Sequence, residues 1–189
     1  MKVLQVIDSG GLYGAEQVLL ALMGSLREQA VESVLASIAE PGEPQKPLEV
    51  AVRADGHEVW RLTMKAGPDR PAARNLVARA RPEGFALLHT HGYKANTLLG
   101  GMRRSVRGLP VVATLHGWTA TRPLSRMGAY ETLERFALRR ADRVVAVSEA
   151  MVERWGLRRR YGDRLRVIHN GIPVRDDGLI SRRAELPRE

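Results

Sequence analysis

The chain has 189 residues, a formal net charge of +9, 44% hydrophobic and 27% charged residues, and no cysteine. This length suits one domain with a sizeable core, and the composition is typical of a soluble globular protein. Without cysteine there is no disulfide framework, no thiolate zinc site and no cysteine nucleophile. No apolar run approaches the roughly 20 residues of a membrane-spanning helix, and the apolar stretch before Asp8 is too short for a signal peptide. We therefore expect a cytoplasmic protein.

The charge is unevenly distributed along the chain. Residues 1–50 contain three basic and seven acidic side chains, a balance of −4. Residues 51–189 contain 27 basic and 14 acidic side chains, a balance of +13. Such asymmetry favours a polyanionic neighbour, which could be nucleic acid, anionic lipid headgroups or phosphorylated substrates. A codon-biased source is an equal alternative, because arginine supplies 26 of the 30 basic residues.

Short apolar runs alternate with helical periodicities from the first residue to about residue 171. The apolar runs predict strands at 2–7, 31–38, 57–62, 85–92, 109–117, 142–148 and 165–171. Apolar residues at helical spacing predict helices at 14–29, 48–56, 70–82, 93–106, 125–141 and 149–162. This alternation predicts an α/β fold, a Rossmann-like doubly wound parallel sheet of about seven strands with helices on both faces.

Histidines and glycines gather where the predicted strands end. In an open parallel sheet, ligands bind outside the carboxyl ends of the strands. Four of the five histidines lie at such ends: His89, His91, His116 and His169. This clustering predicts a functional site at the carboxyl edge of the sheet without naming a reaction.

The first strand runs into a helix through the glycine-rich turn "SGGLYGAE" at residues 9–16. Glycines permit a tight turn there, and the free N–H groups at the start of a helix suit an anion such as a diphosphate. Only Gly11 and Gly14 keep the last interval of a dinucleotide fingerprint, and no Gly-Lys-Ser/Thr follows, so a dinucleotide site and a P-loop are both disfavoured. An ordinary glycine turn remains an alternative.

His116, in "ATLHGW", follows the fifth predicted strand. Its imidazole could orient a hydroxyl or bond a phosphate or sugar oxygen, although local hydrogen bonding alone is the alternative. His89 and His91 share one face of the fourth predicted strand, as metal ligands would. No third ligand is evident beside them and cysteine is absent, so we expect no metal.

The predicted helix 149–162 sets three apolar residues against arginines: Met151, Val152 and Trp155 against Arg154 and Arg158 to Arg160. This pattern suits a helix that rests on an anionic membrane surface. The alternative is an ordinary amphipathic helix whose apolar side lies in the core. The chain has neither an interleaved aromatic platform nor a recognition motif, so we expect no nucleic-acid partner.

Several segments in this order resemble the N-terminal domain of the retaining GT-B glycosyltransferases of group 1 (family 4). They are "GGLYGAEQVLLAL", "HTHGYKAN", "VVATLHG", "RRADRVVAVSEAM" and "VIHNGIP". The resemblance implies an acceptor-side domain over residues 1–172. It also implies that residues 173–189 begin the crossing to a C-terminal domain that is missing from this chain. That domain would hold most of the contacts to a nucleotide sugar.

The same resemblance implies a role for each motif residue. It implies a reaction that needs no metal and no cofactor. The co-substrate would be a nucleotide-diphosphate sugar, and the acceptor would be a sugar, a lipid-linked molecule or a phosphorylated molecule. His116 would act beside the donor sugar and the attacking hydroxyl as the catalytic residue. The remaining residues would bind donor phosphate (Gly11, Gly14), line the acceptor side (His91, Tyr93, Asn96) and border the cleft near the hinge (Asn170, Gly171).

The expected function is transfer of a sugar, with retention, to an acceptor hydroxyl, and the chain alone is expected to be inactive. A stand-alone binding or partner module of the same fold is one alternative. A sugar-nucleotide epimerase of the GT-B type is another, but it needs cleft carboxylates, and the strand ends supply only Asp8 and Glu149. The broken glycine spacing disfavours an NAD-dependent enzyme further. The basic helices also suggest the inner face of an anionic membrane as a peripheral location.

Overall fold

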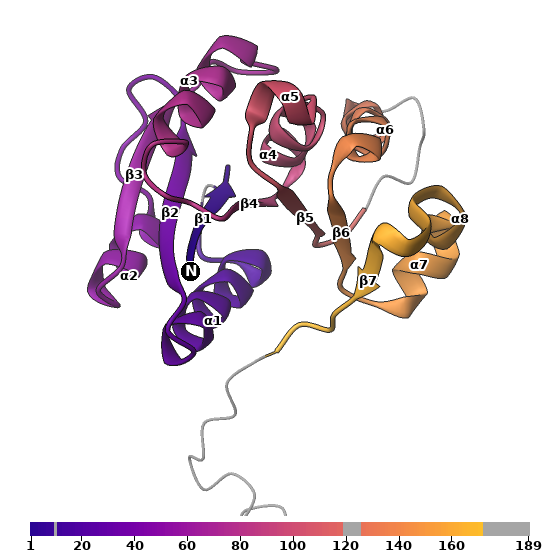
Figure 1. The fold of residues 1–189 in the computed structure, drawn as a ribbon, viewed down its shortest axis with the longest axis horizontal. Helices are drawn as coiled ribbons and strands as arrows, with labels where there is room; N and C mark the ends of the chain where they lie inside the picture. The colour runs from indigo at the N-terminus through magenta and orange to yellow at the C-terminus, as the bar shows by residue number, and fades with distance from the viewer. Residues whose placement is uncertain (10, 119–125, 172–189) are drawn as a thin grey trace, which may run out of the picture.

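A computed structural model describes residues 1–9, 11–118 and 126–171 (Figure 1). Its centre is one sheet of seven parallel strands in the order β3-β2-β1-β4-β5-β6-β7. The strands are Lys2–Ile7 (β1), Glu32–Ala39 (β2), Glu58–Thr63 (β3), Leu87–His91 (β4), Val111–Leu115 (β5), Arg143–Ala146 (β6) and Leu165–Val167 (β7). The predicted Rossmann-like doubly wound sheet is therefore confirmed.

The direction in which strands are added reverses between β1 and β4. The chain moves outward from β1 to β3, returns to place β4 on the other side of β1, and then moves outward to β7. Because crossovers between parallel strands are right-handed, this reversal places the two sets of helices on opposite faces. Figure 1 shows α1 and α2 below the sheet and α3 to α6 above it. The helices are Gly14–Glu28 (α1), Pro47–Ala54 (α2), Arg70–Ala80 (α3), Tyr93–Ala95 (α4), Arg104–Arg107 (α5), Arg126–Ala137 (α6), Glu149–Trp155 (α7) and Leu157–Tyr161 (α8).

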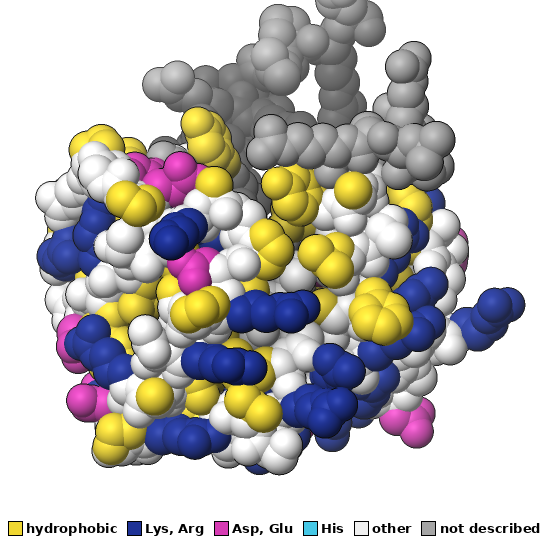
Figure 2. Space-filling view, turned by 90° about the horizontal axis from the view of Figure 1, so that it is seen from above, with side chains coloured by type: hydrophobic (Ala, Val, Ile, Leu, Met, Phe, Trp, Pro, Cys, Tyr) yellow, Lys and Arg dark blue, Asp and Glu magenta, His cyan; other side chains and the backbone are white. Residues whose placement is uncertain are grey.

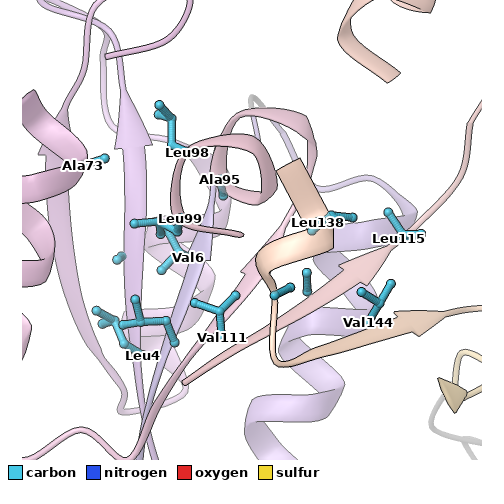
Figure 3. Packing of buried hydrophobic residues seen from close by; sticks show 14 of the residues in the cluster. Leu4, Val6, Ala73, Ala95, Leu98, Leu99, Val111, Leu115, Leu138 and Val144 are labelled. Carbon is cyan, nitrogen blue, oxygen red and sulfur yellow. The ribbon is translucent and has the colours of Figure 1, made fainter. Parts of the chain in front are cut away.

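The larger hydrophobic core lies between the sheet and the helices that follow β3. Figure 3 shows Leu4, Val111 and Val144 on strands packed below Leu99 and Leu138. All five side chains are at most 1% exposed. A smaller cluster on the other face joins α1 and α2 to the first three strands, through Leu19, Met23, Leu35, Leu48 and Val52. Both faces of the sheet are thus covered by helices, as parallel sheets require.

The helix predicted over 93–106 is interrupted. It consists of α4, a π-helical turn Asn96–Gly100 (η1), and then the separate helix α5. Two glycines explain the break. A Cβ on Gly100 would lie 2.9 Å from Leu138, and one on Gly101 would lie 2.5 Å from the carbonyl oxygen of Thr97. Glycine at both positions lets α6 and its continuation Leu138–Arg140 (η2) pack directly on this turn.

The helix predicted over 149–162 is also divided, because Gly156 adopts the left-handed conformation at a φ of 59°. Its predicted apolar stripe does not face outward. Met151 and Val152 are 9% and 1% exposed and belong to the larger core. The apolar side of this helix therefore lies in the core, as the alternative of an ordinary amphipathic helix predicts, and does not face a membrane.

The strands end earlier than the sequence predicts at several carboxyl ends. The clearest case is β7, predicted over 165–171 but ending at Val167. His116 and His169 consequently lie in the loops that follow β5 and β7. The division predicted at residue 173 lies outside the described residues. Within the described ranges, no helix is both long enough and apolar enough to cross a bilayer.

A buried arginine braces the amino ends of β5 and β6. Arg107 is fully buried, pairs with Asp142 and donates to the carbonyl groups of Met102 (2.6 Å) and Leu109 (2.9 Å). Asp142 also accepts from the N–H of Val111 at 2.7 Å. Burial opposes ionisation of Asp142, but these hydrogen bonds and the arginine outweigh it and hold its pKa below the ordinary value.

We expect the substitution Arg107→Ala to lower the free energy of unfolding by about 3 kcal/mol, because it leaves a carboxylate and several carbonyl groups without their buried donor. Urea unfolding followed by circular dichroism measures this change. Arg103→Ala, on the exposed start of the same helix, should change the value by less than about 0.5 kcal/mol. Equal effects of the two substitutions would contradict the role of the buried pair.

Candidate functional site

Two of the pockets at the carboxyl edge of the sheet contain predicted site residues. One, of about 580 Å³, lies between α1 and the strands β4 to β7, and its lining includes four predicted site residues, His91, His116, Asn170 and Gly171. The other, of about 290 Å³, lies over the ends of β1 and β4, and its lining includes the predicted residue Tyr93. The structure thus brings five of the eight predicted site residues to pockets at one edge.

Three histidines form a row at this edge. The centroids of the His89 and His91 rings lie 4.2 Å apart, with the ring planes tilted by 43°, as neighbours on one face of a strand. Nδ1 of His91 lies 3.0 Å from Nε2 of His116, and Nε2 of His91 lies 3.1 Å from Oε1 of Gln5. Nε2 of His89 lies 2.8 Å from the hydroxyl of Thr114. The histidines therefore contact strand side chains and one another.

The proton positions in this row follow from the orientation of the Gln5 amide. With the amide oxygen towards His91, Gln5 can only accept, so Nε2 of His91 carries the proton and Nδ1 does not. His91 Nδ1 then accepts from Nε2–H of His116. A neutral His116 therefore presents Nδ1 as a lone pair. This atom is buried and has no hydrogen-bond partner among the described residues.

Burial keeps these imidazoles neutral. It lowers the pKa of His89 to about 4, with the nearby His116 adding to the effect. Burial, followed by the two neighbouring histidines, lowers the pKa of His91 well below its ordinary value. Burial lowers the pKa of His116 as well, although the Glu16 carboxylate opposes the shift. At neutral pH, His116 is thus an uncharged hydrogen-bond acceptor.

The start of α1 lies at the end of β1, where the sequence predicts an anion site. Gly14 is the first residue of the helix, and a Cβ there would meet no atom within 4 Å. A Cβ on Gly11 would instead lie 2.7 Å from the ring of Tyr13, and the Gly11 N–H donates to the hydroxyl of Ser9 at 3.1 Å. Glu16 accepts from the N–H of Tyr13 at 2.8 Å. Gly14 therefore leaves open space, whereas the N–H of Gly11 is already engaged.

Tyr93 lines the smaller pocket, while its hydroxyl is held by hydrogen bonds within the protein. The hydroxyl donates to the carbonyl of Gly117 at 3.1 Å and lies 3.3 Å from Oε1 of Glu131. The rest of this pocket combines apolar side chains with Asp8, Glu40 and Lys94. Burial raises the pKa of Asp8, and the positive charges of Lys46 and Lys94 oppose that shift. The pocket thus offers an apolar wall beside a group of charged side chains.

Asn96, predicted to line the acceptor side, is fully buried. Its Oδ1 accepts from the hydroxyl of Thr90 at 2.6 Å, and its Nδ2 donates to the carbonyl of Thr114 at 3.1 Å and to Glu134 at 2.7 Å. The other oxygen of Glu134 accepts from Nε1 of Trp118 at 2.6 Å. Asn96 thus joins β4, β5 and α6, and its contact with an acceptor stays a prediction.

Glu134 is ionisable in spite of its buried position. Burial raises its pKa to about 7, although hydrogen bonds from Trp118 and Asn96 oppose the shift. Neither Glu134 nor Glu16 is predicted from the sequence as part of this region. The capping-box pattern that could reveal Glu16 is hidden because tyrosine, not serine or threonine, precedes the helix.

Asn170 and Gly171 are exposed at the end of the described residues and border the larger pocket beside His169. Their predicted position near a hinge concerns a segment outside the described ranges. Among the residues that the structure describes, no group of three or more histidine, aspartate or glutamate side chains could hold a metal ion. The roles predicted for the site residues from the resemblance remain predictions.

We expect the free energy of unfolding to fall as the pH decreases from 6.5 towards 4, in part because of His89. Its folded pKa, about 4, is lower than its ordinary value of 6.5, so the unfolded chain takes up a proton first. The contribution is at most about 3 kcal/mol. Denaturant unfolding across this range should show a shallower pH dependence for His89→Gln than for the unchanged chain. An identical slope for both would contradict the neutral, buried state.

The chain resembles several solved structures, which share its fold at low sequence identity. Anabaena Alr3699/HepE in complex with UDP is 20% identical with a TM-score of 0.73, and the match covers 98% of this chain and 49% of that one. A glycosyltransferase from Rickettsia africae is 16% identical with a TM-score of 0.61, over 100% and 50% of the two chains. A putative UDP-N-acetylglucosamine 2-epimerase from Listeria monocytogenes is 13% identical with a TM-score of 0.60, over 87% and 44% of the two chains.

This chain thus spans about half the length of the solved structures that it matches. No curated protein matches its sequence. The sequence model of Glycosyltransferase Family 4 matches residues 13–176, which is most of the chain. The match includes the histidine row and most of the residues that line the two pockets. The chain belongs to Glycosyltransferase Family 4.

Proposed function

We propose that this chain is the acceptor-side half of a glycosyltransferase that moves a sugar, with retention, from a nucleotide-diphosphate sugar to an acceptor hydroxyl. The observation that carries the proposal is the unpartnered Nδ1 of His116, on a ring that lines the 580 Å³ pocket of a family 4 chain. A related fold, HepE, has been solved with UDP and glucose, which supports a nucleotide sugar as the donor here.

In the proposed reaction, the bond between the sugar C1 and the diphosphate oxygen breaks, and its electron pair leaves with the diphosphate. The acceptor oxygen forms a bond to C1 on the same face, and its proton passes to the departing phosphate oxygen. His116 accepts a hydrogen bond at Nδ1 from a reacting hydroxyl and so fixes its direction. The negative charge on the diphosphate is met by preorganised N–H groups at the start of α1, where Gly14 leaves space for it.

The smaller pocket is the proposed acceptor site. Leu98, Met127 and Leu133 give it an apolar wall, while Asp8 and Lys94 supply charged groups that can bond hydroxyls. Such a lining favours an acceptor that carries both a hydroxyl-bearing polar part and an apolar part. Tyr93 would contact it through the ring, since its hydroxyl already donates to Gly117.

The donor half of the site is proposed to reside in a C-terminal domain beyond this chain. The matched structures, about twice as long as this chain, support that proposal. We further propose a cytoplasmic protein in peripheral contact with the inner face of a membrane, from the balance of +13 carried by residues 51–189.

An epimerase is the weaker proposal. The likeness to a putative UDP-N-acetylglucosamine 2-epimerase concerns the fold alone. Of the two carboxylates at the strand ends, Glu149 is paired with Arg158 at 2.7 Å on the surface. Of these two carboxylates, this leaves Asp8 as the candidate for a catalytic acid or base. Because the epimerase needs more than one such carboxylate in the cleft, sugar transfer fits better.

We expect the 189-residue chain alone to transfer no sugar, because half of the groups that bind the diphosphate are proposed to lie elsewhere. Release of the nucleoside diphosphate from a set of radiolabelled nucleotide sugars, with a membrane extract as the source of acceptors, measures this. The matched comparison is the same chain joined to a family 4 C-terminal domain. Equal turnover of the two proteins would contradict the division of the site.

In the two-domain protein, we expect His116→Ala to lower kcat by about 100-fold or more, because a positioned imidazole at the reacting hydroxyl is lost. His57→Ala serves as the control, since His57 lies just before β3 at the opposite edge of the sheet. Steady-state kinetics of both variants test the assignment. An activity of His116→Ala that matches that of the control would rule out a catalytic His116.

A further inference from the structure

The outer side of α6 and the start of α5 form a surface that the transfer reaction leaves unexplained. We define the α5–α6 surface by six exposed side chains: Arg103, Arg104, Leu133, Phe136, Arg139 and Arg140. Leu133 and Phe136 are 43% and 59% exposed, and both lie on the outer side of α6. The outward position of both follows from the opposite side of α6, where Glu131, Glu134 and Ala137 are buried.

Hydrogen bonds hold the two parts of the α5–α6 surface together. Arg140 donates to the carbonyl of Gly101 at 3.0 Å, and Arg107 donates to the carbonyl of Arg140 at 3.2 Å. The guanidinium of Arg139 lies 5.3 Å from the centre of the Phe136 ring. The apolar ring and the cationic groups therefore form one surface.

Among the described residues, one of the four arginines of this surface, Arg104, has a carboxylate partner. Both carboxylates of α6 are buried beneath it, and the nearby Asp142 is already paired with Arg107 and Arg104. Figure 2, which looks down on α3 to α6, shows dark blue arginine and lysine side chains spread across this face with yellow side chains between them and little magenta. The face is thus cationic, with isolated apolar projections.

We propose that the α5–α6 surface docks the protein on an anionic lipid bilayer. Arginines attract anionic headgroups, and a few apolar side chains enter the boundary between headgroups and acyl chains. Leu133 also lines the smaller pocket, so that pocket opens beside the docked surface. A lipid-borne acceptor would then reach the pocket without leaving the bilayer.

Other partners fit the α5–α6 surface less well. A stable protein interface buries a continuous apolar core, whereas this surface presents two separate apolar groups. Single-stranded nucleic acid binds to successive aromatic side chains, and this surface presents one aromatic ring. The inference rests on the proposed peripheral location but not on the sugar chemistry, so vesicle binding can fail or succeed independently of transfer.

The test is co-sedimentation of the 189-residue chain with two kinds of vesicle. One consists of phosphatidylcholine alone, and the other also contains about 30% phosphatidylglycerol. We expect binding to the anionic vesicles only, and weaker binding as salt is added. Arg103→Glu with Arg139→Glu should lower the affinity about tenfold or more, because four units of charge change at the surface. Phe136→Ser should lower it severalfold.

Two matched controls carry the same chemical changes on other surfaces. Arg53→Glu with Arg166→Glu alters the same charge on α2 and β7, and Val50→Ser removes an apolar group that is 52% exposed on α2. Both should bind as the unchanged chain does. No binding to anionic vesicles, or equal losses in the controls, would overturn the assignment. Binding to an oligonucleotide in place of vesicles would overturn it too and identify nucleic acid as the partner.

Discussion

The arrangement of the carboxyl edge depends on one buried amide. Asn96 lies where β4, β5 and α6 meet, and its side chain bonds Thr90, the carbonyl of Thr114 and Glu134. Each of these polar groups would carry a desolvation cost if it were left alone, so the three elements can approach only in the geometry that satisfies all of them. Glu134 then fixes Trp118, the last described residue before α6. This junction therefore fixes the relative positions of elements that line the two pockets.

The reversal of strand order supplies the second condition for a site. It places the ends of β1 and β4 side by side, so that Gln5 on β1 can meet His91 although 86 residues separate them. The start of α1, the histidine row and the smaller pocket are brought to one edge by this topology rather than by any local motif.

The sequence predicts the sheet well because parallel strands buried on both faces leave continuous apolar runs. All seven strands occur within a few residues of their predicted places. The two errors in the helices arise at glycines, through close packing in one case and backbone conformation in the other. Gly100 and Gly101 interrupt a helix because α6 packs on them, and Gly156 divides another by a left-handed turn. The buried roles of Glu134 and Asn96 could not be predicted either, since helical spacing does not tell which carboxylate meets which amide across the fold.

Through His91, the hydrogen-bonding character of His116 depends on Gln5, which lines neither of the two pockets described above. An amide can present either its oxygen or its nitrogen, and only the oxygen requires a proton on Nε2 of His91. If the amide turned over, each proton in the row would move to the opposite nitrogen, and His116 would offer a hydrogen in place of a lone pair. Whether His116 donates or accepts a hydrogen bond at the carboxyl edge therefore depends on the orientation of an amide on the buried strand β1.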